Sequence, residues 1–145
     1  MKPSVKLTIP SNAQFLYLGR KVILYFLNYH EVQEDLAFKL VLCIDEACAN
    51  IIKYSYGGNT ECPIEMSLFL EDDVFWVEIR DYGKQCDAAK IKPRPLDEVK
   101  PGGLGTHFMN AIMDDVEYCT NRDHGTLLTM RKRLTTDDFS VTANT

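Results

Sequence analysis

The segment "IDEACANIIKYSYGG", residues 44–58, has the pattern of an apolar helix that runs into a glycine pair, yet Asp45, Glu46 and Asn50 interrupt it. Residues four apart lie above one another on a helix, so Glu46 and Asn50 share one face, and Lys53 follows on the same stripe. Burying a carboxylate or an amide is costly unless it is paired, hydrated or bound to an ion. The segment therefore predicts either a solvent-facing stripe or a ligand site.

Around this segment the sequence predicts two helices and three strands. The apolar repeat extends the helix back to about Glu34, and a preceding helix is expected over "AQFLYLGRKVILYFLNY". Alternation predicts a first strand over Val5–Ile9, which Pro10 ends. After the glycine pair, "IEMSLFLED" and "VFWVEIRDYG" alternate around a tight acidic turn at Asp72 and Asp73, the pattern of a hairpin.

The second half of the chain begins with a long loop and ends in another hairpin. Residues 84–104 hold three prolines and a glycine pair, and we expect them to form a functional lid. A short helix over "GTHFMNAIMDDV" and strands over "VEYCTNR" and "TLLTMRKRL" follow. The expected fold is α+β: one domain over residues 1–134, a two-layer sandwich with helices on one face of a mainly antiparallel mixed sheet, and a loose tail over 135–145.

Composition narrows the class of protein. The chain has 145 residues, 46% hydrophobic and 26% charged, which suits one compact domain. Its net charge of −5 is spread over both halves without a basic cluster, which argues against direct binding of nucleic acid. There is no long uncharged apolar run, so no membrane segment is expected. Five cysteines without a CxxC pair indicate a reducing compartment, and we expect a cytoplasmic protein.

Three short motifs could together form a nucleotide site. A carboxylate and a carbonyl oxygen suit Mg²⁺, which takes only one or two protein oxygens and completes its shell with water and phosphates. The glycines of "PGGLGTHF", residues 101–108, would let the chain approach an anion at a helix N-terminus. Asp81 ends an apolar strand, where its carboxylate could accept a hydrogen bond from an exocyclic amine such as that of adenine. Each motif alone also fits a plain structural role.

Taken in order, these motifs resemble the four nucleotide-binding boxes of the GHKL ATPase superfamily, the histidine-kinase-like ATPase domains. The last box is the pair Gly125-Thr126. More narrowly, "DEACANIIKYSY", "RPLDEVKPGGLG" and "MDDVEY" are similar to the bacterial anti-sigma-factor serine/threonine protein kinases. The resemblance extends from about Val5 to Leu134 and implies a Bergerat fold with ATP and Mg²⁺ bound between the long helix and the lid.

The resemblance also implies a role for each residue of the site. Glu46 matches the general base toward the attacking hydroxyl, and Asn50 matches the magnesium ligand. Asp81 matches the carboxylate that reads adenine, with Gly83 in the turn beside the base. The remaining expected nucleotide contacts are Lys53, at a position that is often basic, Gly103, Leu104, Gly105 and Thr106 in the lid and phosphate segment, and Thr126, which supports the hydrogen bonds on the adenine side.

The resemblance implies an ATP-dependent serine/threonine protein kinase that is also an anti-sigma factor. Such a protein phosphorylates a small anti-sigma-antagonist (STAS-type) domain, sequesters a sigma factor and forms a homodimer. One departure favours a different class: Gln85 stands where the adenine box usually has its second glycine. The alternative is a catalytically silent ATP-binding module that sequesters its partner. An ATP hydrolase or a histidine kinase fragment is a third reading, although none of the three histidines lies in a dimerising phosphoacceptor helix.

Overall fold

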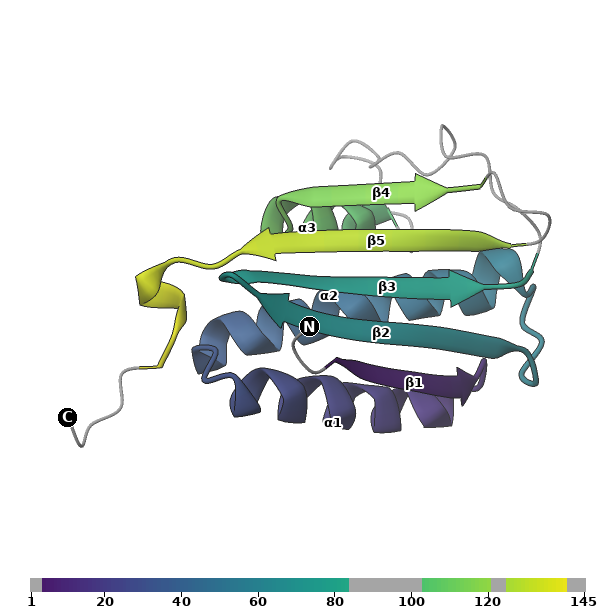
Figure 1. Cartoon of the computed structure of the whole chain (residues 1–145). Helices are drawn as coiled ribbons and strands as arrows, with labels where there is room; N and C mark the ends of the chain where they lie inside the picture. Colours follow the sequence, from purple (N-terminus) through teal and green to yellow (C-terminus); the bar gives the residue numbers. More distant parts are fainter. Residues whose placement is uncertain (1–3, 84–102, 121–124, 141–145) are drawn as a thin grey trace.

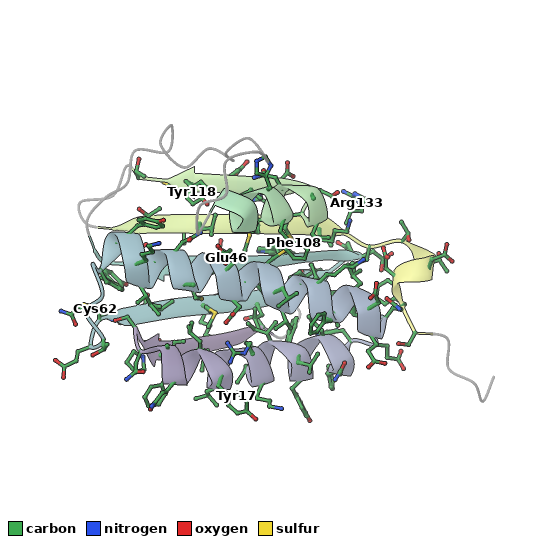
Figure 2. The ribbon with its side chains drawn as sticks, turned by 180° about the vertical axis from the view of Figure 1, so that it is seen from behind. Tyr17, Glu46, Cys62, Phe108, Tyr118 and Arg133 are labelled. Carbon is green, nitrogen blue, oxygen red and sulfur yellow. The ribbon has the colours of Figure 1, made fainter. Side chains whose placement is uncertain are left out.

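The computed structural model describes residues 4–83, 103–120 and 125–140, and these form two layers. One layer is an antiparallel sheet in the order β1-β2-β3-β5-β4. Helices α1, α2 and α3 cover one of its faces (Figures 1 and 2). The expected α+β sandwich is therefore confirmed, and all four pairings between the described strands are antiparallel. The strands are β1 (Val5–Pro10), β2 (Pro63–Glu71), β3 (Val74–Asp81), β4 (Asp115–Cys119) and β5 (Thr126–Arg133).

The first two helices form where the sequence predicts them. Helix α1 spans Ala13–Tyr29, and the side chain of Asn12 accepts a hydrogen bond from the backbone N–H of Gln14 at its start. Helix α2 spans Glu34–Asn50, and the side chain of Gln33 caps it by accepting from the N–H of Leu36. Side-chain acceptors at both starts satisfy N–H groups that have no partner within the helix.

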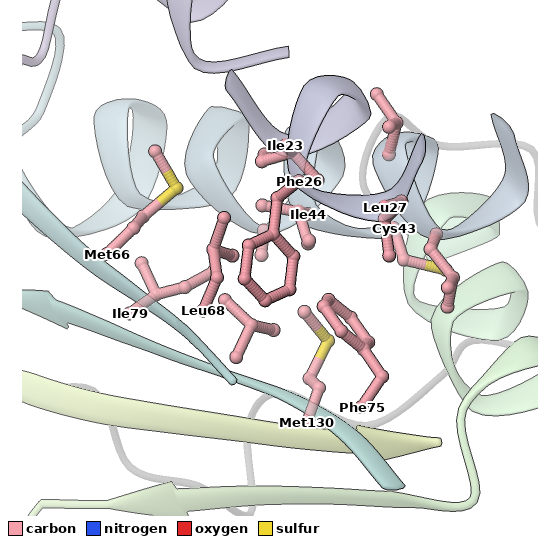
Figure 3. Close-up of a cluster of buried hydrophobic side chains, with 14 of the residues drawn as sticks. Ile23, Phe26, Leu27, Cys43, Ile44, Met66, Leu68, Phe75, Ile79 and Met130 are labelled. Carbon is pink, nitrogen blue, oxygen red and sulfur yellow. The ribbon is translucent and has the colours of Figure 1, made fainter. Parts of the chain in front are cut away.

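Helix α2 is apolar over a wide arc because it is the central helix of its layer. It packs against α1 on one side and against α3, which spans Gly103–Ile112, on the other. Its residues Leu40 and Ile44 have no exposed surface. Both belong to the same buried cluster as Phe26 of α1 and Phe75 of β3. Figure 3 shows Ile44 with these two phenylalanines, whose ring centroids are 6.3 Å apart. Burial of side chains of this size contributes about 1.5–3 kcal/mol each to folding.

The hairpin between β2 and β3 turns at the two predicted residues. Asp72 and Asp73 have φ angles of 54° and 62°, and Glu71 pairs with Val74 on either side of them. Two consecutive positive φ angles define the tight turn whose twist matches that of the strands. The turn fixes the register that places Ile79 on the buried face and brings Asp81 to the far end of β3.

Two segments differ from the sequence-based expectation. The expected helix over residues 105–116 ends at Ile112, because Asp115 already pairs with Arg131 in the sheet. The expected loose tail is wrong for residues 135–140, which form a short 3-10 helix (η3, Thr136–Asp138) and dock on the turn between α1 and α2. There Ser140 N–H donates to the carbonyl of Glu31, and Gln33 N–H donates to that of Asp138. Residues 141–145 lie outside the described part of the chain.

Among the described residues, no helix is long and apolar enough to span a bilayer. The four described cysteines are free thiols. Burial raises the pKa of Cys43 to about 12, and burial, with a smaller effect of Asp45, raises that of Cys48 to about 12. Thiols with such high pKa values are nearly all protonated at neutral pH, so these two behave as packing residues.

Candidate nucleotide-binding site

The candidate site lies at the end of the molecule where β3 ends and β5 begins, on the right in Figure 1. Asp81 of β3 pairs there with Thr126 of β5, and the two residues are only 2% and 5% exposed. The carboxylate Oδ1 of Asp81 accepts a hydrogen bond of 3.1 Å from the backbone N–H of Gly83. The side chain of Ser55 and the backbone of Thr126 also hydrogen-bond to it.

The surroundings of Asp81 both raise and lower the pKa of its carboxyl, and the net effect is a rise. Burial, the largest effect, raises the pKa of its carboxyl, while the hydrogen bonds from Gly83, Ser55 and Thr126 and the charge of Arg80 oppose that rise. A carboxyl that is buried without a fully compensating ion pair favours a ligand that donates a hydrogen bond to it. The exocyclic amine of adenine is a donor of this kind.

A second polar atom at this place lacks a partner. The hydroxyl Oγ1 of Thr126 is buried, and no hydrogen-bond partner is present for it among the described residues. A buried hydroxyl without a partner costs about 1–3 kcal/mol, so it asks for a bound molecule or an ordered water. Asp81 and Thr126 together therefore offer an acceptor and a hydroxyl at one place, which fits the polar edge of a purine base.

Two glycines allow the backbone to close tightly around Asp81. A Cβ on Gly83 would collide with the carbonyl oxygen of Ser55, and a Cβ on Gly125 would collide with that of Asp81 itself. Gly125 also has a φ of +81°, which side chains other than glycine rarely adopt. Both glycines are therefore required by close backbone contact, which gives the Asp81-x-Gly83 and Gly125-Thr126 motifs a physical reason.

Replacing Gly125 with alanine should destabilise the fold strongly. The positive φ alone costs about 1–2 kcal/mol for a residue with a Cβ, and overpacking typically adds about 1–3 kcal/mol. Gly58 is the matched control, since its φ is +87° but nothing lies within 4 Å of its would-be Cβ. Urea unfolding should give Gly125→Ala a loss about 1–3 kcal/mol larger than Gly58→Ala. Equal losses would contradict the close contact with Asp81.

The polar residues that interrupt the apolar pattern of α2 face two different helices. Asp45 lies toward α1, where its Oδ1 is 2.8 Å from Nη1 of Arg20. Figure 2 places Glu46 on the edge of α2 that faces α3. Glu46 and Asn50 are half-buried, while Lys53 is exposed. The polar stripe predicted for Glu46 and Asn50 is thus partly withdrawn from water, although it is open enough to meet a ligand.

The pKa of the Glu46 carboxyl is raised above its usual value. Burial, the largest effect, raises its pKa, and the neighbouring charge of Asp45 raises it further. The positive charge of Lys53 opposes both. A carboxylate with a raised pKa is a stronger base than an exposed one, and a pKa nearer the working pH makes proton transfer more effective.

The segment expected to bind phosphate is described only in part. Gly103, Leu104, Gly105 and Thr106 belong to the first part of α3, which packs beside α2, while their side chains lie outside the described part of the structure. The N-terminus of such a helix presents free N–H groups and a positive dipole end to an anion. Gln85 and the rest of the expected lid, residues 84–102, also lie outside the described residues.

A magnesium ion would depend on the nucleotide for most of its ligands. In the described part of the chain, no group of three or more His, Cys, Asp or Glu side chains is placed to hold a metal. The amide oxygen of Asn50 is of the type that Mg²⁺ accepts, and this ion needs only one or two protein oxygens when phosphates supply others. The donor set therefore fits Mg²⁺ brought in with a nucleotide.

The sequence did not predict that Ser55 and Tyr56 contact the end of β3. Ser55 is the last residue of a π-helical turn, η1 (Ile51–Ser55), that follows α2, and Tyr56 comes directly after this turn. Single π turns inside or after α-helices often mark functional sites, but hydrophobic periodicity does not reveal them. The only signal in the sequence is that the polar stripe of α2 continues past Asn50 to three hydroxyl-bearing residues, Tyr54, Ser55 and Tyr56, before the glycine pair.

Comparisons with known proteins identify the family of the chain. Residues 9–132 match the family described as the histidine kinase-like ATPase domain. The chain is 26% identical over 144 residues to the serine-protein kinase RsbW of Halalkalibacterium halodurans, covering 93% of this chain and 86% of the relative. It is 28% identical over 138 residues to the anti-sigma F factor of Bacillus subtilis, covering 92% and 94% of the two chains.

The fold is also found in solved structures. The structure of the RsbU and RsbW domains of Rv1364c from Mycobacterium tuberculosis superposes with a TM-score of 0.66 at 14% identity, covering 92% of this chain and 32% of that chain. At this identity the likeness concerns the fold alone. The family match, in contrast, spans all of β2, β3 and α2, on which Glu46, Asn50 and Asp81 lie. The chain belongs to the histidine kinase-like ATPase domain family.

Proposed function

We propose that the protein is an ATP-dependent serine/threonine protein kinase that acts as an anti-sigma factor. The observation that carries this proposal is the buried Asp81 carboxylate beside the unpartnered hydroxyl of Thr126, packed against the end of the helix that carries Glu46 and Asn50. The names of its relatives, a serine-protein kinase and an anti-sigma F factor, support the same reading.

In this proposal each residue has one task in binding ATP. Asp81 accepts a hydrogen bond from the adenine amine, Thr126 supports that contact, and Gly83 forms the turn beside the base. Glycines 103 and 105, with the backbone of Leu104 and Thr106, approach the phosphates at the start of α3. Asn50 holds Mg²⁺, which when bound would offset the charge that builds up on the phosphates. Lys53 adds a positive charge near Glu46.

The transfer step assigns the proton to Glu46. Its carboxylate takes the proton of the acceptor serine or threonine hydroxyl as that oxygen forms a bond to the γ-phosphorus. The bond between the γ-phosphorus and the bridging oxygen to the β-phosphate breaks, and ADP leaves with the electron pair. Most of the acceleration in such reactions comes from positioning and from stabilising charge, and a general base adds typically about 10²- to 10⁴-fold.

The proposed acceptor is a small anti-sigma-antagonist domain of the STAS type, and the proposed sequestered partner is a sigma factor in the cytoplasm. The direct test is transfer of labelled γ-phosphate from ATP to such a domain in the presence of Mg²⁺. Phosphorylation of a serine or threonine of the antagonist supports the kinase. Binding of ATP and of the partner without any transfer would instead support the catalytically silent module, which the departure at Gln85 favours.

We further propose that the protein is a homodimer. Support comes from β1, whose outer edge is unpaired among the described strands, and from α1 beside it, where Tyr25 and Tyr29 are about three-quarters exposed. An unpaired edge next to exposed aromatic rings is a common contact between copies of one chain. Light scattering should give about twice the chain mass of 16.6 kDa. A mass of one chain at micromolar concentration would contradict the dimer.

The pH dependence of transfer tests the electrostatics around Glu46. Because Lys53 lowers the pKa of Glu46, Lys53→Gln should raise it, so the rate at saturating ATP should begin to fall at a higher pH on acidification. Lys39→Gln is the matched control, since Lys39 pairs with Asp35 one turn into the same helix. If the pH at which the transfer rate falls on acidification is the same in Lys53→Gln as in the unaltered protein, Glu46 is not the titrating base.

A further inference from the structure

The hydroxyl of Tyr56 lies between two backbone groups of different strands. It donates a hydrogen bond of 2.5 Å to the carbonyl of Pro63, the first residue of β2, and accepts one of 2.7 Å from the N–H of Tyr82, which follows β3. Its ring is half-buried against the core. One side chain thus joins the segment after α2 to the start of β2 and to the residue that follows β3.

The π-helical turn is what delivers Tyr56 to this place. Tyr56 N–H donates to the carbonyl of Ile51 at 3.0 Å, and Gly58 N–H donates to that of Ile52 at 2.8 Å. These bonds span five and six residues, so the turn is wider than an α-helical turn and the following residues are rotated from the path of α2. The turn begins directly after Asn50, and its last residue, Ser55, hydrogen-bonds to Asp81.

Residues 81–83 are therefore held by Ser55, the last residue of this turn, and by Tyr56, which follows it. Ser55 contacts the side chain of Asp81, and Tyr56 holds the N–H of Tyr82. Gly83 lies against the carbonyl of Ser55 and the ring of Tyr56 so closely that a Cβ would collide with both. Any shift of Tyr56 would move the peptide units on either side of Tyr82, and hence the direction of the Asp81 carboxylate.

We propose that Tyr56 is a positioning residue that sets base specificity. Its hydroxyl fixes the Asp81–Gly83 turn relative to the helix that carries Glu46 and Asn50, so that the adenine-reading carboxylate and the phosphate-side residues keep one spacing. This inference rests on the proposed function, because it needs ATP as the ligand. Tyr56 itself touches no reacting atom in this account, and its effect reaches the nucleotide only through Asp81.

The test compares two nucleotides in the variant Tyr56→Phe. Inosine triphosphate has the same phosphates as ATP but a carbonyl in place of the exocyclic amine, so it cannot donate to Asp81 from that position. Tyr56→Phe should weaken ATP binding about five- to tenfold, as expected when the hydrogen bond between Asp81 and the adenine amine is lost. It should weaken the binding of inosine triphosphate less than about twofold. A merely structural role would weaken both nucleotides equally. Tyr17→Phe, which alters an exposed tyrosine of α1, should change the affinity for neither nucleotide.

The outcomes separate this inference from the proposed function. If the unaltered protein binds ATP in preference to inosine triphosphate and Tyr56→Phe keeps that preference, the role of Tyr56 is overturned and the kinase proposal stands. If the unaltered protein binds neither nucleotide or does not distinguish them, both fall. Should Tyr56→Phe melt below the assay temperature, Ser55→Ala replaces it. It removes the hydroxyl that hydrogen-bonds directly to the Asp81 side chain and should give the same selective loss of ATP affinity.

Discussion

Replacing Glu46 with glutamine should reduce phosphoryl transfer by about 10²- to 10⁴-fold and leave ATP affinity within about twofold. Glutamine has nearly the shape of glutamate, so the half-buried position on α2 is filled as before. The amide cannot accept the proton of the acceptor hydroxyl, so only the step in which the base acts is slowed. Single-turnover transfer to the antagonist domain measures the rate, and calorimetry measures the affinity.

The matched control is the neighbouring carboxylate. Asp45 lies one position away but is paired with Arg20 of α1, so it is turned from the site. Asp45→Asn should keep the transfer rate within about tenfold, since Asp45 acts on Glu46 only through its charge. Normal transfer by Glu46→Gln, or an equal loss in both variants, would refute the assignment of Glu46 as the base.

Replacing Asp81 with asparagine should weaken ATP binding by about 10- to 150-fold, the range expected for a lost hydrogen bond to a charged group. Oδ1 of Asp81 accepts from Gly83 N–H, Ser55 and Thr126 also hydrogen-bond to the carboxylate, and the adenine amine is a further donor to its two oxygens. Asparagine has a single acceptor oxygen and an NH₂ group that only donates, so less acceptor capacity is left for the adenine amine. Titration with ATP and Mg²⁺ measures the loss, and affinity equal to that of the unaltered protein would exclude Asp81 as the base reader.

The same substitution should not lower the stability of the free protein. The pKa of Asp81 is raised in the fold, chiefly by burial, so the folded state binds this proton more tightly than the unfolded state does. The stability from Asp81 is therefore full below its unfolded pKa and is lost as the pH rises through its folded pKa. Asparagine never ionises, so the melting temperature at neutral pH should stay equal or rise. A fall of several degrees would contradict this balance.

The elements with a clear local signal were predicted well. The seventeen residues of α1 were expected as a helix, because apolar residues recur there at helical spacing. The turn at Asp72 and Asp73 was predicted because two short polar residues between alternating strands tolerate positive φ angles. Glu46, Asn50 and Asp81 were selected because polar groups that interrupt or end apolar elements need partners.

The features that were missed depend on contacts between distant segments. Asp115 belongs to β4 and not to the preceding helix, because it pairs with Arg131 of β5. This partner is distant in the sequence, so the local pattern around Asp115 does not predict the pairing. Residues 135–140 have little apolar character, and backbone hydrogen bonds to Glu31 and Gln33 hold them instead. The π turn at Ile51–Ser55 is stabilised where its next residue reaches β2 and β3. The lid over residues 84–102 and the role of Gln85 stay predictions.

Binding of ATP in the presence of Mg²⁺, measured by titration calorimetry on the full chain, tests the central claim most directly. We predict saturable heat of binding with one nucleotide per chain. The affinity for ATP should fall strongly when Mg²⁺ is chelated, and binding should be largely lost in Asp81→Asn. If millimolar ATP with Mg²⁺ gives no heat of binding, or if Asp81→Asn binds as tightly as the unaltered protein, the site built on Asp81, Thr126 and α2 does not hold a nucleotide.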